Sequence, residues 1–124
     1  MSRQVDNLLE GLAGSLGQES FLTLFEHQAV KIERIVSRSH SSPPGFWYDQ
    51  PEDEWLTILR GHATLEFQGG ELVGMKQGDC LTIPSHVKHR VHETDPETIW
   101  LAVHIIETQA RPQRKGKGDG DDAT

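Results

Sequence analysis

The sequence predicts a single all-β domain of 124 residues, built as a barrel or a sandwich. Short segments that alternate apolar and polar residues recur from residue 30 onward, and turns rich in glycine or proline separate them. The pair Gly69-Gly70 is a strong hairpin signal, because glycine readily adopts the positive φ that tight hairpin turns need. The chain is also long enough to bury a core without disulfides or a structural metal.

Residues 1–29 are expected to form an N-terminal arm with a short helix that packs on the barrel. Residues 19–26 fit either a helix or a strand, and we predict a helix. Glycines weaken the first half of the arm, yet five of its apolar residues fall at helical spacing: Val5, Leu8, Leu9, Leu12 and Leu16.

Residues 30–108 are expected to form the barrel. Residues 109–124 contain almost no apolar side chains, so they are expected to form a disordered tail. The predicted strands are 31–36, 55–59, 63–67, 72–75, 80–83, 89–93 and 99–106.

Composition excludes several classes of function. The formal net charge of −7 argues against a nucleic-acid partner, because phosphate binding relies on clustered Lys and Arg. No transmembrane or export segment is visible, so we expect no membrane partner and a cytoplasmic location. The lone cysteine, Cys80, excludes an intramolecular disulfide and fits a reducing compartment, and we expect it to fill a strand as a small apolar residue.

Two segments carry the functional signal. Residues 48–54 combine tyrosine, glutamine and carboxylates, and Gly61 follows them after an apolar strand. Residues 78–89 read Gly-Asp-Cys-Leu-Thr-Ile-Pro-Ser-His-Val-Lys-His. Together they resemble the two motifs of the cupin superfamily, and this resemblance covers residues 30–106. The run 32–50 is similar to a bacterial subgroup of small single-domain cupins without an assigned activity. The matching positions are Glu54 and Gly61 in the first motif and Gly78, Pro84 and His89 in the second.

The resemblance implies a double-stranded β-helix, meaning a jelly-roll barrel with its site at the mouth. The two histidines of the first motif fall on Tyr48 and Gln50, and the second-motif glycine falls on His86. The resemblance therefore implies a metal set of His89 and Glu54, with help from Gln50 and Tyr48. Imidazole and carboxylate suit Fe, Mn, Ni or Zn, although this set should bind less tightly than three imidazoles.

A second histidine ligand would have to come from elsewhere in the chain, and the candidates are His40, His86, His92 and His104. For the substrate pocket we predict His104, His40 and Trp47.

Three functions stay open at this point. The first is a small-molecule cupin whose divalent metal supports an oxygenation, isomerisation or decarboxylation. The second is a metal-free binding module, and the third is a metal-free enzyme that uses His89 and Glu54 as an acid–base pair. Small cupins resemble one another in pairing through outer strands and N-terminal arms, so we also expect a homodimer.

Overall fold

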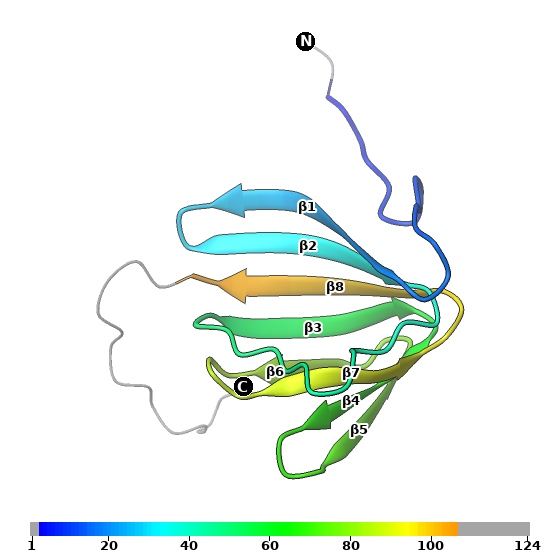
Figure 1. Ribbon diagram of the computed structural model, residues 1–124. Helices are drawn as coiled ribbons and strands as arrows, with labels where there is room; N and C mark the ends of the chain where they lie inside the picture. Colours follow the sequence, from blue (N-terminus) through cyan, green and yellow to red (C-terminus); the bar gives the residue numbers. More distant parts are fainter. Residues whose placement is uncertain (1–2, 107–124) are drawn as a thin grey trace.

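Every regular element in the computed structural model, which describes residues 3–106, is a β-strand (Figure 1). The strands follow one another in the chain as β1 (Glu19–His27), β2 (Val30–Ser37), β3 (Asp53–Arg60), β4 (His62–Phe67), β5 (Leu72–Lys76), β6 (Cys80–Ile83), β7 (His89–Thr94) and β8 (Thr98–Ile105). The predicted strands of the barrel are therefore present, with ends that differ by a few residues.

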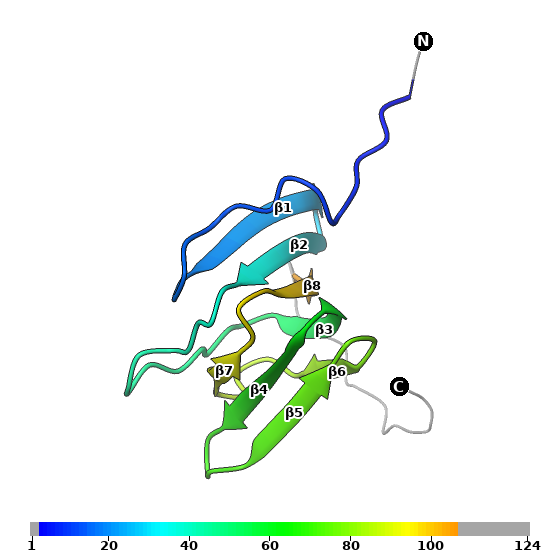
Figure 2. The same ribbon diagram turned by 90° about the vertical axis from the view of Figure 1, so that its right-hand side faces the viewer.

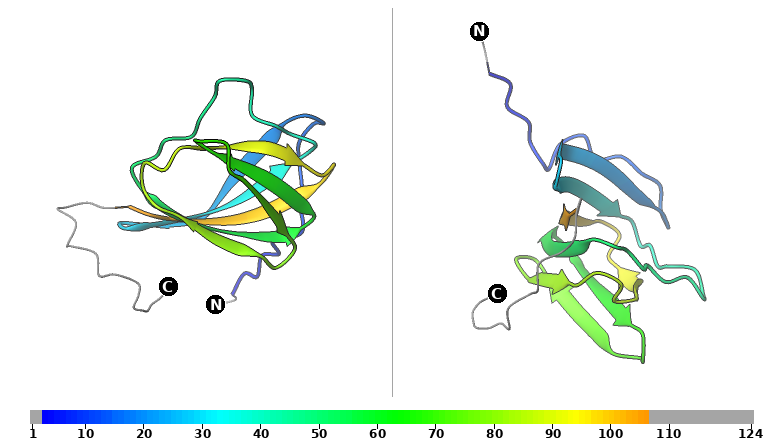
Figure 3. Two further views of the ribbon diagram at one scale, coloured as in Figure 1. Left: turned by 90° about the horizontal axis from the view of Figure 1, so that it is seen from below. Right: turned by 90° about the vertical axis from the view of Figure 1, so that its left-hand side faces the viewer.

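Two antiparallel sheets form the barrel. The larger sheet has the strand order β1-β2-β8-β3-β6, and the smaller sheet has the order β5-β4-β7. Figure 2 shows β1, β2, β8 and β3 of the larger sheet above the smaller sheet, and Figure 3 shows the two sheets facing each other when the molecule is seen from below. The prediction of an all-β jelly-roll barrel is confirmed.

Strand alternation decides which side chains enter the space between the sheets. On β3, Glu54, Leu56 and Ile58 are buried, whereas Trp55 between them is exposed. Successive side chains of a strand point to opposite faces, so Glu54 shares the inner face with the apolar core. That core draws on both sheets and includes Ile35, Leu56, Ile58, Leu65, Ile83, Val91, Trp100 and Ala102.

The predicted N-terminal helix is absent from the described residues. Gly11, Gly14 and Gly17 have φ values of +63°, +132° and +83°, which a right-handed helix cannot contain. The guanidinium of Arg34 on β2 instead donates hydrogen bonds to three backbone carbonyls of the arm, those of Leu8, Glu10 and Gly11. These bonds hold the arm as irregular chain against the outer face of the sheet.

The helix predicted for residues 19–26 is also wrong, because this segment is β1. It pairs with β2 from Glu19 opposite Ser37 to His27 opposite Val30, with a bulge between Thr23 and Phe25. The local pattern allowed both structures, and the long-range ladder with β2 decides for the strand. The larger sheet thus extends into the part of the chain that the sequence assigned to the arm.

Two motif positions where the family carries glycine have the positive φ that glycine favours. Gly61, in the turn between β3 and β4, has a φ of +82°, and a Cβ there would lie 2.6 Å from the carbonyl oxygen of Glu97. His86 occupies the second-motif glycine position and keeps the left-handed backbone, with a φ of +61°. The left-handed conformation is strained for a non-glycine residue, so its retention indicates that the turn before β7 is structurally required.

Three further expectations concern a membrane span, Cys80 and the tail. Within residues 3–106 no helix is long and apolar enough to cross a membrane. Cys80, expected as an apolar filler, is exposed at the start of β6. The predicted tail, residues 109–124, lies outside the described residues.

Candidate functional site

A cavity of about 70 Å³ lies between the two sheets. Strands β1, β2, β3 and β8 of the larger sheet, β4 and β7 of the smaller sheet and residues 48–50 all contribute to its wall. Its polar lining consists of Glu19, Glu33, Tyr48, Gln50, Glu54, His89 and His104. Its apolar lining consists of Phe21, Ile35, Leu56, Leu65, Val91 and Trp100. A small, largely apolar wall with convergent polar groups is the usual form of a small-molecule site.

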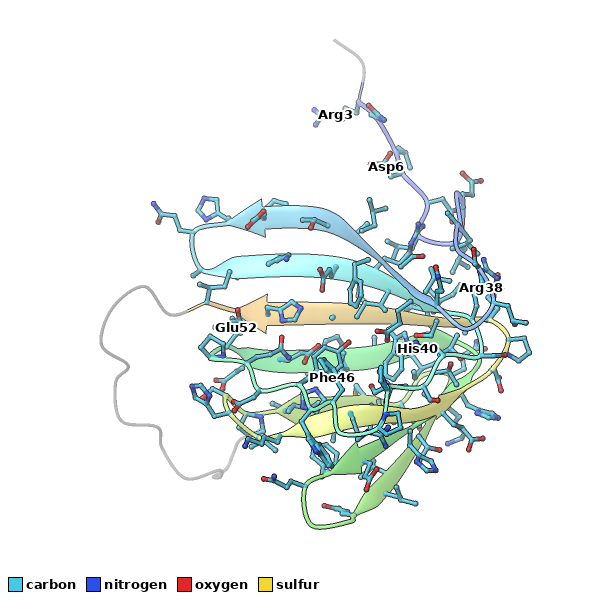
Figure 4. The ribbon with its side chains drawn as sticks, viewed as in Figure 1. Arg3, Asp6, Arg38, His40, Phe46 and Glu52 are labelled. Carbon is cyan, nitrogen blue, oxygen red and sulfur yellow. The ribbon has the colours of Figure 1, made fainter. Side chains whose placement is uncertain are left out.

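The segment between β2 and β3, which carries His40 and Phe46 in Figure 4, brings two predicted site residues to the cavity. Tyr48 pairs with His89 on β7 through two backbone hydrogen bonds, of 2.7 Å and 3.2 Å. The backbone N–H of His86 donates to the carbonyl of Gln50 at 2.7 Å. This extended pairing makes Tyr48 and Gln50, two residues apart, point to the same side.

Glu54 and His89 face each other across the buried end of the cavity. Oε1 of Glu54 accepts a hydrogen bond of 3.1 Å from Nε2 of Gln50 and lies 3.9 Å from Nε2 of His89. Nδ1 of His89 lies 2.9 Å from the carbonyl oxygen of Val87. Because a carbonyl only accepts, Nδ1 carries the hydrogen, and Nε2 of the neutral ring presents its lone pair to the cavity.

Burial raises the pKa of the Glu54 carboxyl above its ordinary value. The neighbouring imidazoles of His104 and His89 oppose this rise, as does the hydrogen bond from Gln50, while the Glu33 carboxylate adds to it. A carboxylate with a raised pKa is a stronger base than an ordinary glutamate, which suits proton transfer near neutral pH.

His104 forms a second carboxylate–imidazole pair in the same wall. It lies directly opposite Glu54 in the pairing of β8 with β3, and its Nε2 lies 3.1 Å from Oε1 of Glu33. Oε2 of Glu33 lies 3.5 Å from Nζ of Lys31. Glu33 is thus held between an imidazole and an ammonium group.

Tyr48 is fixed by a third carboxylate. Its hydroxyl donates a hydrogen bond of 3.0 Å to Oε1 of Glu19, and its ring stacks on the ring of His89 with centroids 5.4 Å apart. Burial, and then the nearby Glu19 carboxylate, raise the pKa of the Tyr48 phenol well above its usual range. The phenol therefore stays protonated and acts as a donor to Glu19.

Two predicted pocket residues do not line the cavity. The imidazole of His40 turns to Glu19, with its Nε2 3.5 Å from Oε1, so it supports the wall from behind. Trp47 precedes Tyr48 on extended chain and therefore points the other way, where the guanidinium carbon of Arg90 lies 6.0 Å from its ring.

Sequence reasoning missed two acidic residues of the lining, Glu19 and Glu33. The alternation of Lys31, Glu33 and Ile35 along β2 could have placed Glu33 beside an inward isoleucine. No comparable signal exists for Glu19, because its position depends on the pairing of β1.

The predicted donors do not fit a tightly held divalent metal. Within residues 3–106, no three His, Cys, Asp or Glu side chains are grouped as a metal ion would require. The phenol of Tyr48 is committed to Glu19, and Gln50 supplies only a neutral amide. His89 and Glu54 alone leave the ligand set short of the three protein ligands usual at catalytic sites.

Comparison with known proteins agrees with the geometry. Residues 39–104 match the family model described as "Cupin domain". A crystal structure from Ralstonia eutropha JMP134, named as a candidate mannose-6-phosphate isomerase, is similar with 42% identity and a TM-score of 0.78 over 85% of this chain and 100% of that one. A search of the curated proteins finds no match.

More distant structures share the fold. A cupin superfamily protein from Desulfitobacterium hafniense DCB-2 has 17% identity and a TM-score of 0.70 over 86% of this chain and 95% of that one. A cupin family protein from Methanocaldococcus jannaschii, with a double-stranded β-helix fold, has 19% identity and a TM-score of 0.65 over 86% and 93%. At these identities the likeness concerns the fold alone.

Proposed function

Because this chain belongs to the cupin family, we propose that it binds a small polar molecule between its sheets and that Glu54 and His89 move protons on it. One observation carries the proposal. A carboxylate oxygen of Glu54 and Nε2 of His89, on two buried side chains, lie 3.9 Å apart on the wall of a cavity. Such a pair can contact one ligand group from two directions.

The two groups would divide the proton transfer between them. Glu54, whose pKa is raised by burial, would take a proton from the ligand as a general base. It would return this proton to the neighbouring carbon of the ligand. His89 would accept the proton of a ligand hydroxyl at Nε2, because Nδ1 already donates to Val87, and would return it to the adjacent carbonyl oxygen. Gln50 would position the Glu54 carboxylate through its amide hydrogen bond. Moving two protons between neighbouring atoms of a ligand is an isomerisation, with no net change in its composition.

The similar protein from Ralstonia eutropha supports this class of reaction, because its name is that of a candidate isomerase. The identity of 42% extends over the whole of that protein. We therefore propose isomerisation as the reaction class of this chain. The substrate of this chain need not be the phosphorylated sugar in that name, because the substrate depends on what the cavity can bind.

Two alternatives come from the sequence. In the metal-supported alternative, a divalent ion would bind His89 and Glu54, and the observation in its favour is the free imidazole Nε2 beside the carboxylate. In the binding-module alternative, the same groups would only orient a ligand. Elemental analysis separates the first alternative from the proposal, and measurement of turnover separates the second.

A panel of small hydroxy-carbonyl metabolites tests the proposed function. We expect some members to raise the melting temperature of the wild type and to be converted to isomers. His89→Ala should lose conversion, whereas His92→Ala, at an exposed position on the same strand, should keep it. Thermal shifts without any conversion would favour the binding module, and conversion that survives in His89→Ala would reject the proposed role of His89.

We also propose that the chain pairs with a second copy through the outer face of its larger sheet. The strand registers align Phe25, Ile32, Val103 and Trp55 in one apolar row across β1, β2, β8 and β3. Phe25 and Trp55 are 55% and 39% exposed. A contiguous exposed apolar face of this kind is typical of a protein–protein contact.

A further inference from the structure

The cavity wall has an unusual balance of charge. Three carboxylates line it, from Glu19, Glu33 and Glu54, together with the imidazoles of His89 and His104. No lysine or arginine is among the lining residues that the structure describes, and Lys31 reaches Glu33 from outside the lining. Charges on the walls of a small, poorly hydrated space act strongly on whatever enters it. The wall therefore favours a positively charged ligand group and opposes a negatively charged one.

Hydrogen-bonding capacity points the same way. Most potential donors of the wall are committed, because the Tyr48 hydroxyl donates to Glu19 and one N–H of the Gln50 amide donates to Glu54. Nε2 of His104 already faces Glu33. Two acceptors are free by contrast. Within residues 3–106 no hydrogen bond reaches Nε2 of His89, whose side chain is only 6% exposed, or Oε2 of Glu54.

The apolar part of the wall suits a cation as well. The lining includes the aromatic residues Phe21 and Trp100, and the ring of Tyr48 lies beside that of His89. The Trp100 ring is fixed by its Nε1–H, which donates to Oγ of Ser37 at 3.0 Å. Aromatic faces attract organic cations through their quadrupole, and the attraction is stronger where water is excluded.

From these observations we infer that the cavity receives the part of its ligand that carries a protonated nitrogen, such as a primary ammonium group. An ammonium group has three donors and no acceptor, so it complements the free Nε2 of His89 and the free Oε2 of Glu54. This inference rests on the proposed function, because it names the chemical class that the same cavity binds.

The same balance opposes anionic groups inside the cavity. A phosphate or carboxylate would enter a wall with three carboxylates and no lysine or arginine, where most donors are already committed to those carboxylates. The name of the similar Ralstonia eutropha protein refers to a phosphorylated sugar. In this chain the phosphate of such a sugar would have to lie outside the cavity.

Three probes of nearly equal size and different charge test the inference: propylammonium, propan-1-ol and propionate. Each is titrated into isotope-labelled full-length protein, and NMR follows the side-chain signals of His89, His104 and Gln50. Propylammonium should shift these signals at concentrations at least about tenfold below those that propan-1-ol requires. Propionate should leave them unchanged.

Charge-neutralising variants then locate the binding. Glu33→Gln should raise the dissociation constant of propylammonium by about three- to tenfold, because it removes one carboxylate from the wall. Glu71→Gln removes an exposed carboxylate in the turn before β5 and should leave the dissociation constant unchanged. Glu19→Gln provides the same comparison if the amide spectrum of Glu33→Gln shows that it does not fold.

The outcomes separate this inference from the proposed function. Equal or tighter binding of propan-1-ol or propionate would overturn the cation preference and leave a small-molecule site in place. Stoichiometric binding of Mn(II) or Zn(II) alone at the same signals, with no response to propylammonium, would also overturn it in favour of a metal. If no probe and no metabolite of the panel moves these signals, the proposed function fails as well.

Discussion

Oε1 of Glu54 and Nε2 of His89 lie 3.9 Å apart, with side chains that are 7% and 6% exposed. The distance is too long for a direct hydrogen bond, so neither atom satisfies the other. Both atoms border the cavity, and each can accept a hydrogen bond. A third group that lies between or beside the two atoms, such as a donor supplied by a ligand, can therefore contact both.

Replacing Glu54 with glutamine should stabilise the protein at neutral pH. Burial raises the pKa of Glu54, so folding favours the protonated carboxyl, and this stabilisation is lost as pH rises through the folded-state pKa. Glu54→Gln mimics the protonated form at every pH. We expect it to equal the wild type near pH 4 and to exceed it by about 1–3 kcal/mol near pH 8.

Thermal denaturation across that pH range measures the difference, with Glu71→Gln as an exposed control. The charged and titratable neighbours of Glu54 include His104, His89, Glu33 and Tyr48, and all are unchanged in both proteins. A variant that becomes less stable than the wild type as pH rises would show that the ionised carboxylate is stabilising, contrary to the effect of burial.

Metal content should fall well below one equivalent per chain. Only one imidazole and one carboxylate of the predicted set face the cavity without another strong partner. Untagged protein purified without chelator, then incubated with Fe(II), Mn(II), Ni(II) or Zn(II) and desalted, would be analysed for metal. One full equivalent in the wild type that disappears in His89→Ala would establish the metal-supported alternative.

Gly61 should tolerate substitution less well than Gly69. Both have positive φ values, of +82° and +104°, so alanine is strained at either position. Only at Gly61 would the added Cβ meet a backbone oxygen, that of Glu97 at 2.6 Å. We expect Gly61→Ala to cost about 1–3 kcal/mol more than Gly69→Ala in denaturant unfolding. Equal costs would mean that the β3–β4 turn moves away from Glu97 easily.

A charge on the outer apolar row should disrupt pairing of two copies. Trp55→Glu places a carboxylate in the row that also contains Phe25, Ile32 and Val103. Light scattering after size exclusion should show a dimer for the wild type and a monomer for the variant. Leu72→Glu, at an exposed apolar position in the smaller sheet, should stay dimeric. A dimer that persists in Trp55→Glu would place the contact elsewhere.

Much of the fold could be predicted from the sequence, as could five of the seven polar residues that line the cavity: Tyr48, Gln50, Glu54, His89 and His104. Period-two alternation placed the strands from β2 to β8, and the spacing of Glu54, Pro84 and His89 identified two residues of the lining. These signals are local, since they need only neighbouring residues or a motif. The prediction of a helix in the N-terminal arm was wrong for the opposite reason, because the structure of the arm depends on Arg34, which lies more than twenty residues away in the chain.

The acidic lining residues Glu19 and Glu33 were not predicted from the sequence for the same reason. Glu19 reaches the cavity only through the pairing of β1 with β2, and Glu33 is significant only because β8 places His104 beside it. Tyr48 looked like a weakened metal ligand from its position in the motif. Its bond to Glu19 makes it a committed donor instead, and this change turns a predicted metal site into an acceptor-rich cavity.

Exchange of ligand hydrogen with solvent tests the proton-transfer pair most directly. Metabolites that shift the cavity signals are incubated with the protein in deuterium oxide, and NMR measures deuterium at carbon next to a carbonyl or a nitrogen. The wild type should incorporate deuterium, and Glu54→Gln and His89→Ala should each be slower by about a hundredfold or more, while Glu71→Gln matches the wild type. Exchange that continues at the wild-type rate in both cavity variants would contradict the assignment of Glu54 and His89.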